Sequence, residues 1–213
     1  MDLGRVIGAV TRVVGDREYE GKPAKAIVAT RTYDTTPDDL WDALTNAERI
    51  PRWFLPVSGD LKLGGRYQLK GNAGGTITQC EPPKALGVTW EYGGQTSWVN
   101  LRLTARAAGR TELELEHIAL VPDEFWKQYG PGAVGVGWDL ALMGLGEHVN
   151  NPAKPAVTPE TAEAWTVSEE GRDFARKASA EWGRAAVANG MSEADAQGVV
   201  ERTSAFYTGV PSS

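Results

Sequence analysis

The chain has 213 residues, of which 22 are Lys or Arg and 28 are Asp or Glu, and its formal net charge is −6. This length fits one large domain, or one domain with an appendage. The basic residues stand singly among acidic ones, which argues against nucleic acid or an anionic membrane surface as a partner. The single cysteine, Cys80, excludes an internal disulfide and favours a reducing compartment, so we expect a cytoplasmic protein.

The N-terminal segment is predicted to be an arm or an extra strand, over residues 1–24. Arg5 and Arg12 interrupt its apolar stretch, so we expect no signal peptide there. Apolar and polar side chains alternate in places over residues 5–21. A clearer strand is predicted over residues 26–33, where β-branched side chains alternate with others.

A capped helix and an aromatic connector follow this strand. Thr36 is suited to accept hydrogen bonds from the free amides of the first turn, and Asn46 is suited to end the helix. Pro51 limits a second helix to one or two turns. Trp53 and Phe54 come next, and large apolar side chains on a connector either plug the core or form the mouth of a cavity.

Glycine and proline turn signals then divide the chain up to residue 120 into short segments rich in Thr, Val, Ile, Tyr and Trp. Links this short require neighbouring strands to be antiparallel. We therefore predict a meander of six strands, to which the strand before the helix adds a seventh. The six segments are residues 61–63, 66–70, 76–81, 85–92, 95–107 and 111–120.

The last of these segments, TELELEHIAL, alternates most regularly. It places Leu113, Leu115 and His117 on one face and three glutamates on the other. A sheet face that carries three glutamates is solvated, so the face with His117 is predicted to point inward.

A long helix is predicted over residues 133–149. Its apolar side chains lie all the way round, so it must be buried on more than one side. Asp139 interrupts the apolar run 133–146, which is too short to span a bilayer. The glycines of residues 132–137 follow no strand of a βαβ unit, so we interpret them as small residues that let the helix approach the sheet, and not as a dinucleotide site.

Residues 151–213 are predicted to form a helical extension. They contain no Leu or Ile, and Thr158, Ser168 and Ser192 each mark the start of a helix. The apolar stripes of these helices are too thin to build a core alone. We therefore expect the extension to dock on the preceding domain, which we predict to comprise residues 25–150.

Several segments resemble one bacterial family. The SRPBCC proteins, and more narrowly the branch named after the activator of Hsp90 ATPase homologues in the START and Bet v 1-like superfamily, have similar motifs. The resemblance implies an α+β helix-grip fold, in which a curved antiparallel sheet of about seven strands wraps a long C-terminal helix. The motifs are DLWDALTNAERIPRWF, SGDLKLGGRYQL, GGTIT, EPP, VTWE, LELEH and the helix from Trp138 to Val149.

The resemblance implies a cavity between the sheet and the long helix, so we predict binding of a hydrophobic small molecule without a cofactor. Some members of the superfamily are enzymes, so a cyclase, dehydratase or hydrolase that uses His117 as acid or base is the first alternative. A module that assists a chaperone through Glu112, Glu114 and Glu116 is a further, less favoured alternative. The sequence leaves a homodimer open.

The predicted ligand-binding residues are aromatic side chains from different elements and one histidine. Apolar walls with a few polar groups are typical of small-molecule sites. The sequence does not decide which faces Trp90 and Trp98 occupy, and plain core packing is the alternative for every aromatic side chain. The residues are Trp53, Phe54, Tyr67, Trp90, Trp98, His117, Phe125 and Trp138.

A metal site is not predicted. Cys80, His117 and His148 have no short spacing of the kind that metal ligands show. His148 stands near the end of the long helix, where we expect a structural role.

Deleting residues 152–213 is expected to lower the melting temperature, because the extension is predicted to cover apolar surface of the domain. Thermal unfolding followed by circular dichroism measures the effect. An unchanged melting curve would contradict the docking of the extension.

Overall fold

The computed structural model of the chain describes residues 2–156 and 158–209, so the ends of the expected arm and extension lie outside the described residues. The described residues divide into two units. The first unit contains residues 2–29, 120–140 and 158–209, and the second unit contains residues 30–119 and 141–156. The division of the chain into arm, domain and extension stays a prediction.

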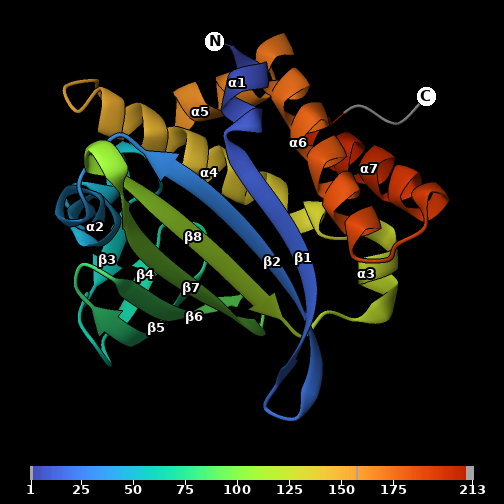
Figure 1. The fold of residues 1–213 in the computed structure, drawn as a ribbon, viewed down its shortest axis with the longest axis horizontal. Helices are drawn as coiled ribbons and strands as arrows, with labels where there is room; N and C mark the ends of the chain where they lie inside the picture. The colour runs from blue at the N-terminus through green and yellow to red at the C-terminus, as the bar shows by residue number, and fades with distance from the viewer. Residues whose placement is uncertain (1, 157, 210–213) are drawn as a thin grey trace. The chain divides into compact units, whose positions relative to one another are not determined.

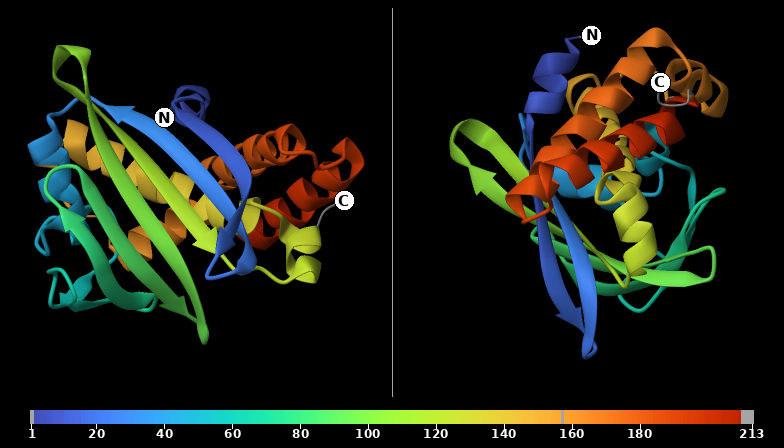
Figure 2. Two further views of the ribbon diagram at one scale, coloured as in Figure 1. Left: turned by 60° about the horizontal axis from the view of Figure 1, so that its bottom comes forward. Right: turned by 90° about the vertical axis from the view of Figure 1, so that its right-hand side faces the viewer.

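Eight strands form one sheet in the order β1-β2-β8-β7-β6-β5-β4-β3, and all neighbours from β3 to β8 are antiparallel (Figures 1 and 2). The expected antiparallel meander of six strands is therefore confirmed as β3 to β8, and β2 and β1 complete the sheet. The strands are β1 (Val10–Tyr19), β2 (Lys22–Tyr33), β3 (Val57–Gly59), β4 (Arg66–Leu69), β5 (Gly74–Glu81), β6 (Ala85–Tyr92), β7 (Gln95–Arg106) and β8 (Arg110–Ala119).

The predicted strand over residues 61–63 is wrong. These residues form a tight turn instead, in which the amide of Lys62 donates to the carbonyl of Asp60 and the amide of Gly65 donates to that of Lys62. One neighbour of β4 is β5, and the other is β3, which comes earlier in the chain than residues 61–63. A three-residue strand without alternation carries too little pattern to be recognised in a sequence.

The second unit begins its helical part with α2 (Pro37–Thr45), which has the predicted caps. The amide of Asp39 donates to Oγ1 of Thr36 at 3.4 Å, and Asn46 ends the helix in an extended conformation. The short helix that follows is a single turn of 3₁₀ helix, η1 (Ile50–Arg52), and Trp53 comes directly after it.

Helix α4 (Gly132–Asn150) confirms the predicted long helix, and its residues from 141 onward belong to the second unit. Within that unit, the hydroxyl of Tyr33 and Nη1 of Arg31 both donate to the carbonyl of Leu142, at 3.1 and 2.9 Å. These bonds attach α4 to β2. A Cβ atom at Gly146 would stand 2.6 Å from the guanidinium of Arg31, so a larger residue there would require the Arg31 side chain to move.

The first unit contains the remaining helices. The capping serines and threonine predicted for the C-terminal segment all accept a bond from the first turn of their helix: Thr158, Ser168 and Ser192. The predicted arm forms a helix followed by β1. The helices are α1 (Leu3–Gly8), α3 (Asp123–Tyr129), α5 (Pro159–Thr166), α6 (Glu169–Ala188) and α7 (Glu193–Thr208).

The core of the first unit is built around α6. Phe174 and Trp182 are fully buried, as the apolar stripe of this helix predicts. On α7, Val199 and Thr203 are buried, whereas Phe206 is 68% exposed. The buried stripe of α7 therefore ends before Phe206.

The glycines at the start of α4 approach helices and not the sheet, which corrects the interpretation from the sequence. A Cβ atom at Gly135 would stand 2.3 Å from the ring of Trp182, and one at Gly132 would stand 2.9 Å from Thr203. The absence of side chains at these positions lets α6 and α7 pack directly on the backbone of α4.

A buried ion pair connects three elements of the first unit. Nε of Arg12 on β1 donates to both carboxylate oxygens of Asp139 on α4, at 3.2 and 3.0 Å. The indole N–H of Trp182 on α6 donates to Oδ2 of Asp139 at 3.0 Å. Burial raises the pKa of Asp139 to about 6, although Arg12 and Trp182 favour the carboxylate.

Replacing Asp139 with Asn is expected to destabilise the protein by about 3–5 kcal/mol, because the guanidinium of Arg12 would stay buried without a counter-charge. Urea unfolding at neutral pH measures the change. Asp173→Asn is the matched control, since it removes one carboxylate of an exposed pair with Lys177 in the same unit and should cost about 1 kcal/mol or less. Equal effects of the two substitutions would contradict a dependence on the buried pair.

Candidate functional site

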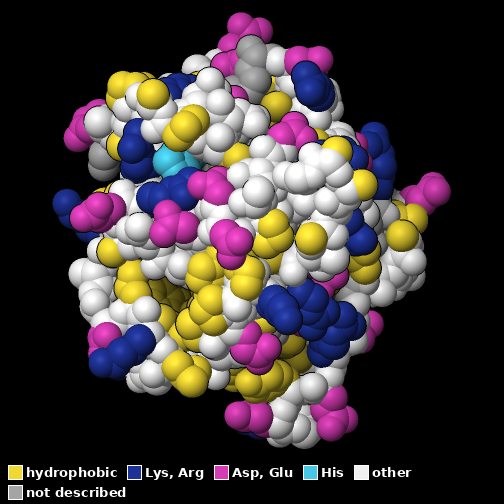
Figure 3. Space-filling view, turned by 60° about the vertical axis from the view of Figure 1, so that its left-hand side comes forward, with side chains coloured by type: hydrophobic (Ala, Val, Ile, Leu, Met, Phe, Trp, Pro, Cys, Tyr) yellow, Lys and Arg dark blue, Asp and Glu magenta, His cyan; other side chains and the backbone are white. Residues whose placement is uncertain are grey.

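The candidate site is an apolar cluster in the second unit. Tyr67, Leu69 and Ile77, on β4 and β5, are its buried centre. Hydrophobic side chains that are only half-buried pack around this centre: Phe54, Leu55, Val57, Leu61, Cys80, Leu86, Val88 and Trp90. Hydrophobic side chains also surround a hollow in the surface of the molecule (Figure 3). Half-buried apolar side chains next to a buried centre provide surface that an apolar ligand could cover.

The face of the sheet that carries Trp90 is the inner one. On β6, Val88 pairs with Val99 of β7, which in turn pairs with His117 of β8. Since directly paired residues share a face and alternate residues of a strand do too, Trp90 lies on the same face as His117. The two rings lie 6.2 Å apart between centroids.

His117 is a buried, neutral polar group on this face. Its side chain is 6% exposed, and its Nε2 lies 2.8 Å from Oγ of Ser97. Oγ of Ser97 donates to the carbonyl of Trp90 at 3.2 Å, so its oxygen accepts from Nε2 of His117. Burial lowers the pKa of His117 to about 4, which keeps the imidazole uncharged at neutral pH.

Trp98 does not share the face of Trp90, a question that the sequence left open. It pairs with Thr89 of β6 and Ile118 of β8, one residue away from the Val88, Val99 and His117 row. A shift of one residue along a strand turns the side chain to the other face. Trp98 therefore lies on the opposite face from His117.

Trp53 and Phe54 lie between η1 and β3. Their rings stack with centroids 5.4 Å apart and planes 21° apart. The indole N–H of Trp53 donates to the carbonyl of Ala43 on α2 at 2.9 Å, whereas Phe54 packs against the apolar cluster. The pair thus joins α2 to the candidate site.

Tyr67 contributes a ring and a satisfied hydroxyl. Its O–H donates to the carbonyl of Thr89 at 2.8 Å, and burial raises the pKa of Tyr67 well above its usual range. The hydroxyl is therefore neutral and already hydrogen-bonded within the protein.

Phe125 and Trp138 belong to the first unit. Phe125 on α3 is 46% exposed, with its ring 5.2 Å from that of Tyr129, and Trp138 on α4 is buried. Of the eight predicted residues, three belong to the apolar cluster: Phe54, Tyr67 and Trp90. The ring of Trp53 stacks on Phe54, and the ring of His117 lies next to Trp90.

Sequence reasoning missed Ser97 as the partner of His117. The two residues are 20 apart in the chain, and Ser97 precedes the aligned partner of His117, Val99, by two residues. The signal that could have found it is the hairpin of β7 and β8, whose register brings Ser97 and Val99 to the inner face.

The acidic face of β8 is largely neutralised by β7. Nη2 of Arg106 lies 2.5 Å from Oε1 of Glu112, and Nη1 of Arg102 lies 3.4 Å from Oε1 of Glu114. These cross-strand pairs leave less net negative charge on this face than the sequence suggests.

Neither a cluster of metal ligands nor a membrane-spanning helix is found among residues 2–156 and 158–209. They contain no group of three or more His, Cys, Asp or Glu side chains placed to hold a metal ion. None of their helices combines the length and the apolar character that crossing a membrane requires.

Residues 34–150 match the family model described as activator of Hsp90 ATPase homolog 1-like protein. The chain belongs to this family. The match extends from the turn before α2 to the end of α4 and so contains the candidate site. No protein with a curated functional description matches the chain.

Two solved structures of CalU16 from Micromonospora echinospora are similar to this member of the activator of Hsp90 ATPase homolog 1-like family. The crystal structure has 34% identity and a TM-score of 0.64, and covers 82% of this chain and 98% of its own. The solution structure has 35% identity and a TM-score of 0.68, and covers 84% of this chain and 95% of its own. MLL2253 from Mesorhizobium loti shares the fold, with 24% identity and a TM-score of 0.53, and covers 61% of this chain and 98% of its own. The helix-grip fold implied by the sequence is thereby confirmed.

The stability of the protein is expected to fall as the pH drops from about 7.5 to about 4.5, in part because of His117. Its pKa is lower in the folded state, so the unfolded chain takes up a proton near pH 6.5, whereas the folded protein resists until about pH 4. Between about pH 7.5 and about pH 4.5, His117 is therefore expected to lower the free energy of unfolding by about 2–3 kcal/mol.

Urea unfolding of the wild type and of His117→Gln at both pH values measures this loss. Glutamine can still hydrogen-bond to Ser97 but does not titrate, so the variant should show a smaller decrease in the free energy of unfolding. The same decrease in both proteins would contradict the assignment to His117.

Proposed function

We propose that the protein binds an uncharged, hydrophobic small molecule at the apolar cluster of the second unit. The observation that carries this proposal is the arrangement of Phe54 and Trp90, half-buried around the buried centre of Tyr67, Leu69 and Ile77. Membership of the family is consistent with it.

The physical driving force would be the removal of apolar surface from water. Each aromatic side chain offers up to about 150–250 Å², and burial contributes about 25 cal/mol per Å². A ligand that covers parts of Phe54 and Trp90 would therefore gain several kcal/mol before the cost of immobilising it.

The polar groups beside the cluster favour an uncharged ligand. His117 is neutral, with its pKa lowered to about 4 by burial, and the hydroxyl of Tyr67 is neutral and hydrogen-bonded to Thr89. A charged ligand would lose its hydration without gaining a counter-charge from these groups. His117 is suited to orient one polar group of the ligand.

The imidazole of His117 and the hydroxyl of Ser97, 2.8 Å apart, support an enzyme as the second candidate. Because His117 is neutral at pH 7, it could accept a proton from a substrate but has none to give as an imidazolium. Mass spectrometry of the molecule that co-purifies with the wild type and with His117→Gln distinguishes the two candidates. The same mass in both favours binding, and a different mass favours turnover.

The other expectations from the sequence remain proposals. The single cysteine, Cys80, supports a cytoplasmic location. A homodimer stays open beside a small-molecule ligand. A chaperone partner is less favoured, because arginines of β7 pair with the acidic face of β8.

Trp90→Ala is expected to weaken the binding of a neutral apolar probe such as N-phenyl-1-naphthylamine about tenfold or more, because a large part of the ligand's contact surface is lost. Titration followed by the fluorescence of the probe measures the dissociation constant without relying on tryptophan emission.

Trp98→Ala is the matched control. It removes the same side chain from the adjacent strand but from the opposite face of the sheet, so probe binding should be unchanged. Circular dichroism establishes that both variants fold. Equal loss of affinity in the two variants, or no saturable binding to the wild type, would contradict the proposed site.

A further inference from the structure

The connector, residues 46–55, passes directly over the C-terminal part of α4. A Cβ atom at Gly144 would stand 2.5 Å from the carbonyl oxygen of Trp53, so the backbones of the two segments touch. At its far end the connector carries Phe54, which packs against the apolar cluster. The position of Phe54 therefore depends on what holds the connector in place.

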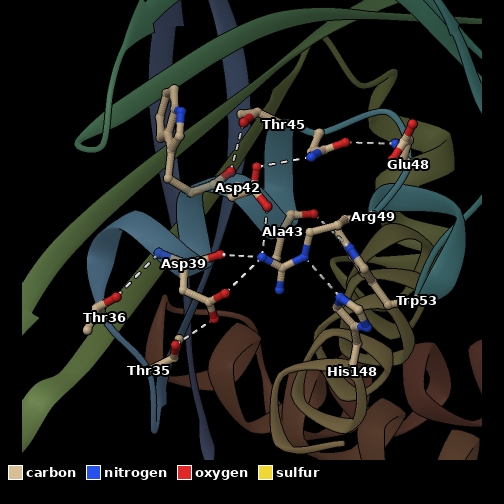
Figure 4. Close-up of polar contacts among 12 residues, drawn as sticks. Thr35, Thr36, Asp39, Asp42, Ala43, Thr45, Glu48, Arg49, Trp53 and His148 are labelled. Atoms are coloured by element: carbon tan, nitrogen blue, oxygen red, sulfur yellow. Dashed lines mark hydrogen bonds and ion pairs between the residues drawn. The ribbon is translucent and has the colours of Figure 1, made fainter. Parts of the chain in front are cut away.

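Arg49 attaches the connector to two helices (Figure 4). Its Nη1 donates to Oδ1 of Asp39 at 2.8 Å and to Oδ2 of Asp42 at 2.9 Å, both on α2. Its Nε donates to Nε2 of His148 on α4 at 3.2 Å. The guanidinium therefore bridges α2 and α4 across the connector.

Two other side chains of the connector reinforce this attachment. Nη2 of Arg52 donates to the carbonyls of Pro152 and Lys154, just beyond the end of α4, at 2.5 and 3.1 Å. The indole N–H of Trp53 donates to the carbonyl of Ala43 on α2. Arg52 therefore bonds residues beyond α4, whereas Arg49 bonds a side chain of α4 itself, His148.

The bond from Arg49 requires a neutral His148. Nε2 accepts from Arg49 only when it carries no proton. His148 is 5% exposed, and burial together with the charges of Arg49 and Arg52 lowers its pKa, while Asp39 acts in the opposite direction. Asp42 faces the same guanidinium. The imidazole is thus neutral at pH 7 and is placed beside two cations.

We propose that Arg49 and His148 form a proton-sensitive lock on the connector, and that protonation of His148 releases Phe54 and opens the hydrophobic site. This inference rests on the proposed function, since it assigns a regulation to the same site. Protonation turns Nε2 from an acceptor into a donor and brings an imidazolium against Arg49 and Arg52. Arg49 then keeps its bonds to Asp39 and Asp42 on α2 but loses its hydrogen bond to His148 on α4.

Hydrogen exchange of the connector tests the lock without any ligand. The wild type and His148→Gln are compared at about pH 7.5 and about pH 5, so that the intrinsic exchange rate is the same within each pair. Glutamine keeps an acceptor for Arg49 but gains no proton. At about pH 7.5 the two proteins should exchange residues 46–55 equally. At about pH 5 the wild type should exchange about tenfold faster, the factor expected for one lost charge-assisted hydrogen bond.

Arg49→Met provides a second variant that does not depend on the behaviour of glutamine at position 148. It removes the bridge at every pH. At both pH values its connector should therefore exchange faster than that of His148→Gln. Arg102→Gln is the control, because it removes an exposed arginine that pairs with Glu114 on the sheet. It should behave like the wild type. Equal exchange in the wild type and His148→Gln at about pH 5, or slow exchange in Arg49→Met, would overturn the lock.

Dissociation of N-phenyl-1-naphthylamine, followed by stopped flow, connects the lock to the site. The probe should leave the wild type about tenfold faster at about pH 5 than it leaves His148→Gln, because the same hydrogen bond is lost. Faster exchange of the connector without faster dissociation would show that the lock does not control the site. If the probe binds none of the variants, the proposed function fails, and the exchange data still decide whether the lock exists.

Discussion

The backbone of α4 lies in direct contact with other elements at several points, and glycines make this contact sterically feasible. In the first unit, a Cβ atom at Gly135 would stand 2.3 Å from Trp182, and in the second unit one at Gly144 would stand 2.5 Å from the backbone of Trp53. Cβ atoms essentially never come so close to other atoms, so a larger residue would displace its neighbour. The packing of α6 and of the connector therefore depends on these positions.

Two buried titratable side chains, Asp139 and His117, each have a polar partner. Asp139 is paired with Arg12 and hydrogen-bonded to Trp182, and His117 lies within hydrogen-bond distance of Ser97. Burial shifts each pKa toward the neutral form, upward for Asp139 and downward for His117. The two sites differ in the partner: the ion pair of Asp139 with Arg12 connects β1 to α4, whereas His117 and Ser97 form a pair on two strands of the sheet.

Local signals in the sequence predicted the elements well. Thr36, Ser168 and Ser192 cap helices as expected, because a cap depends on residues within one turn. The alternation of β8 predicted its buried face correctly, since that pattern lies within a single strand. The sequence left the face of Trp98 undecided, because that face depends on the register of neighbouring strands, which no local pattern specifies.

The sequence by itself determined the family, the helix-grip fold and the aromatic character of the candidate site. Only the tertiary structure decided which distant residues are in contact. Trp90 lies next to His117, Trp182 and Thr203 pack against glycines of α4, and Arg49 donates a hydrogen bond to His148. The physical reason is the separation along the chain: Arg49 and His148 are 99 residues apart, and such contacts follow from how the helices and strands pack. Caps and alternation, by contrast, arise from interactions between residues a few positions apart.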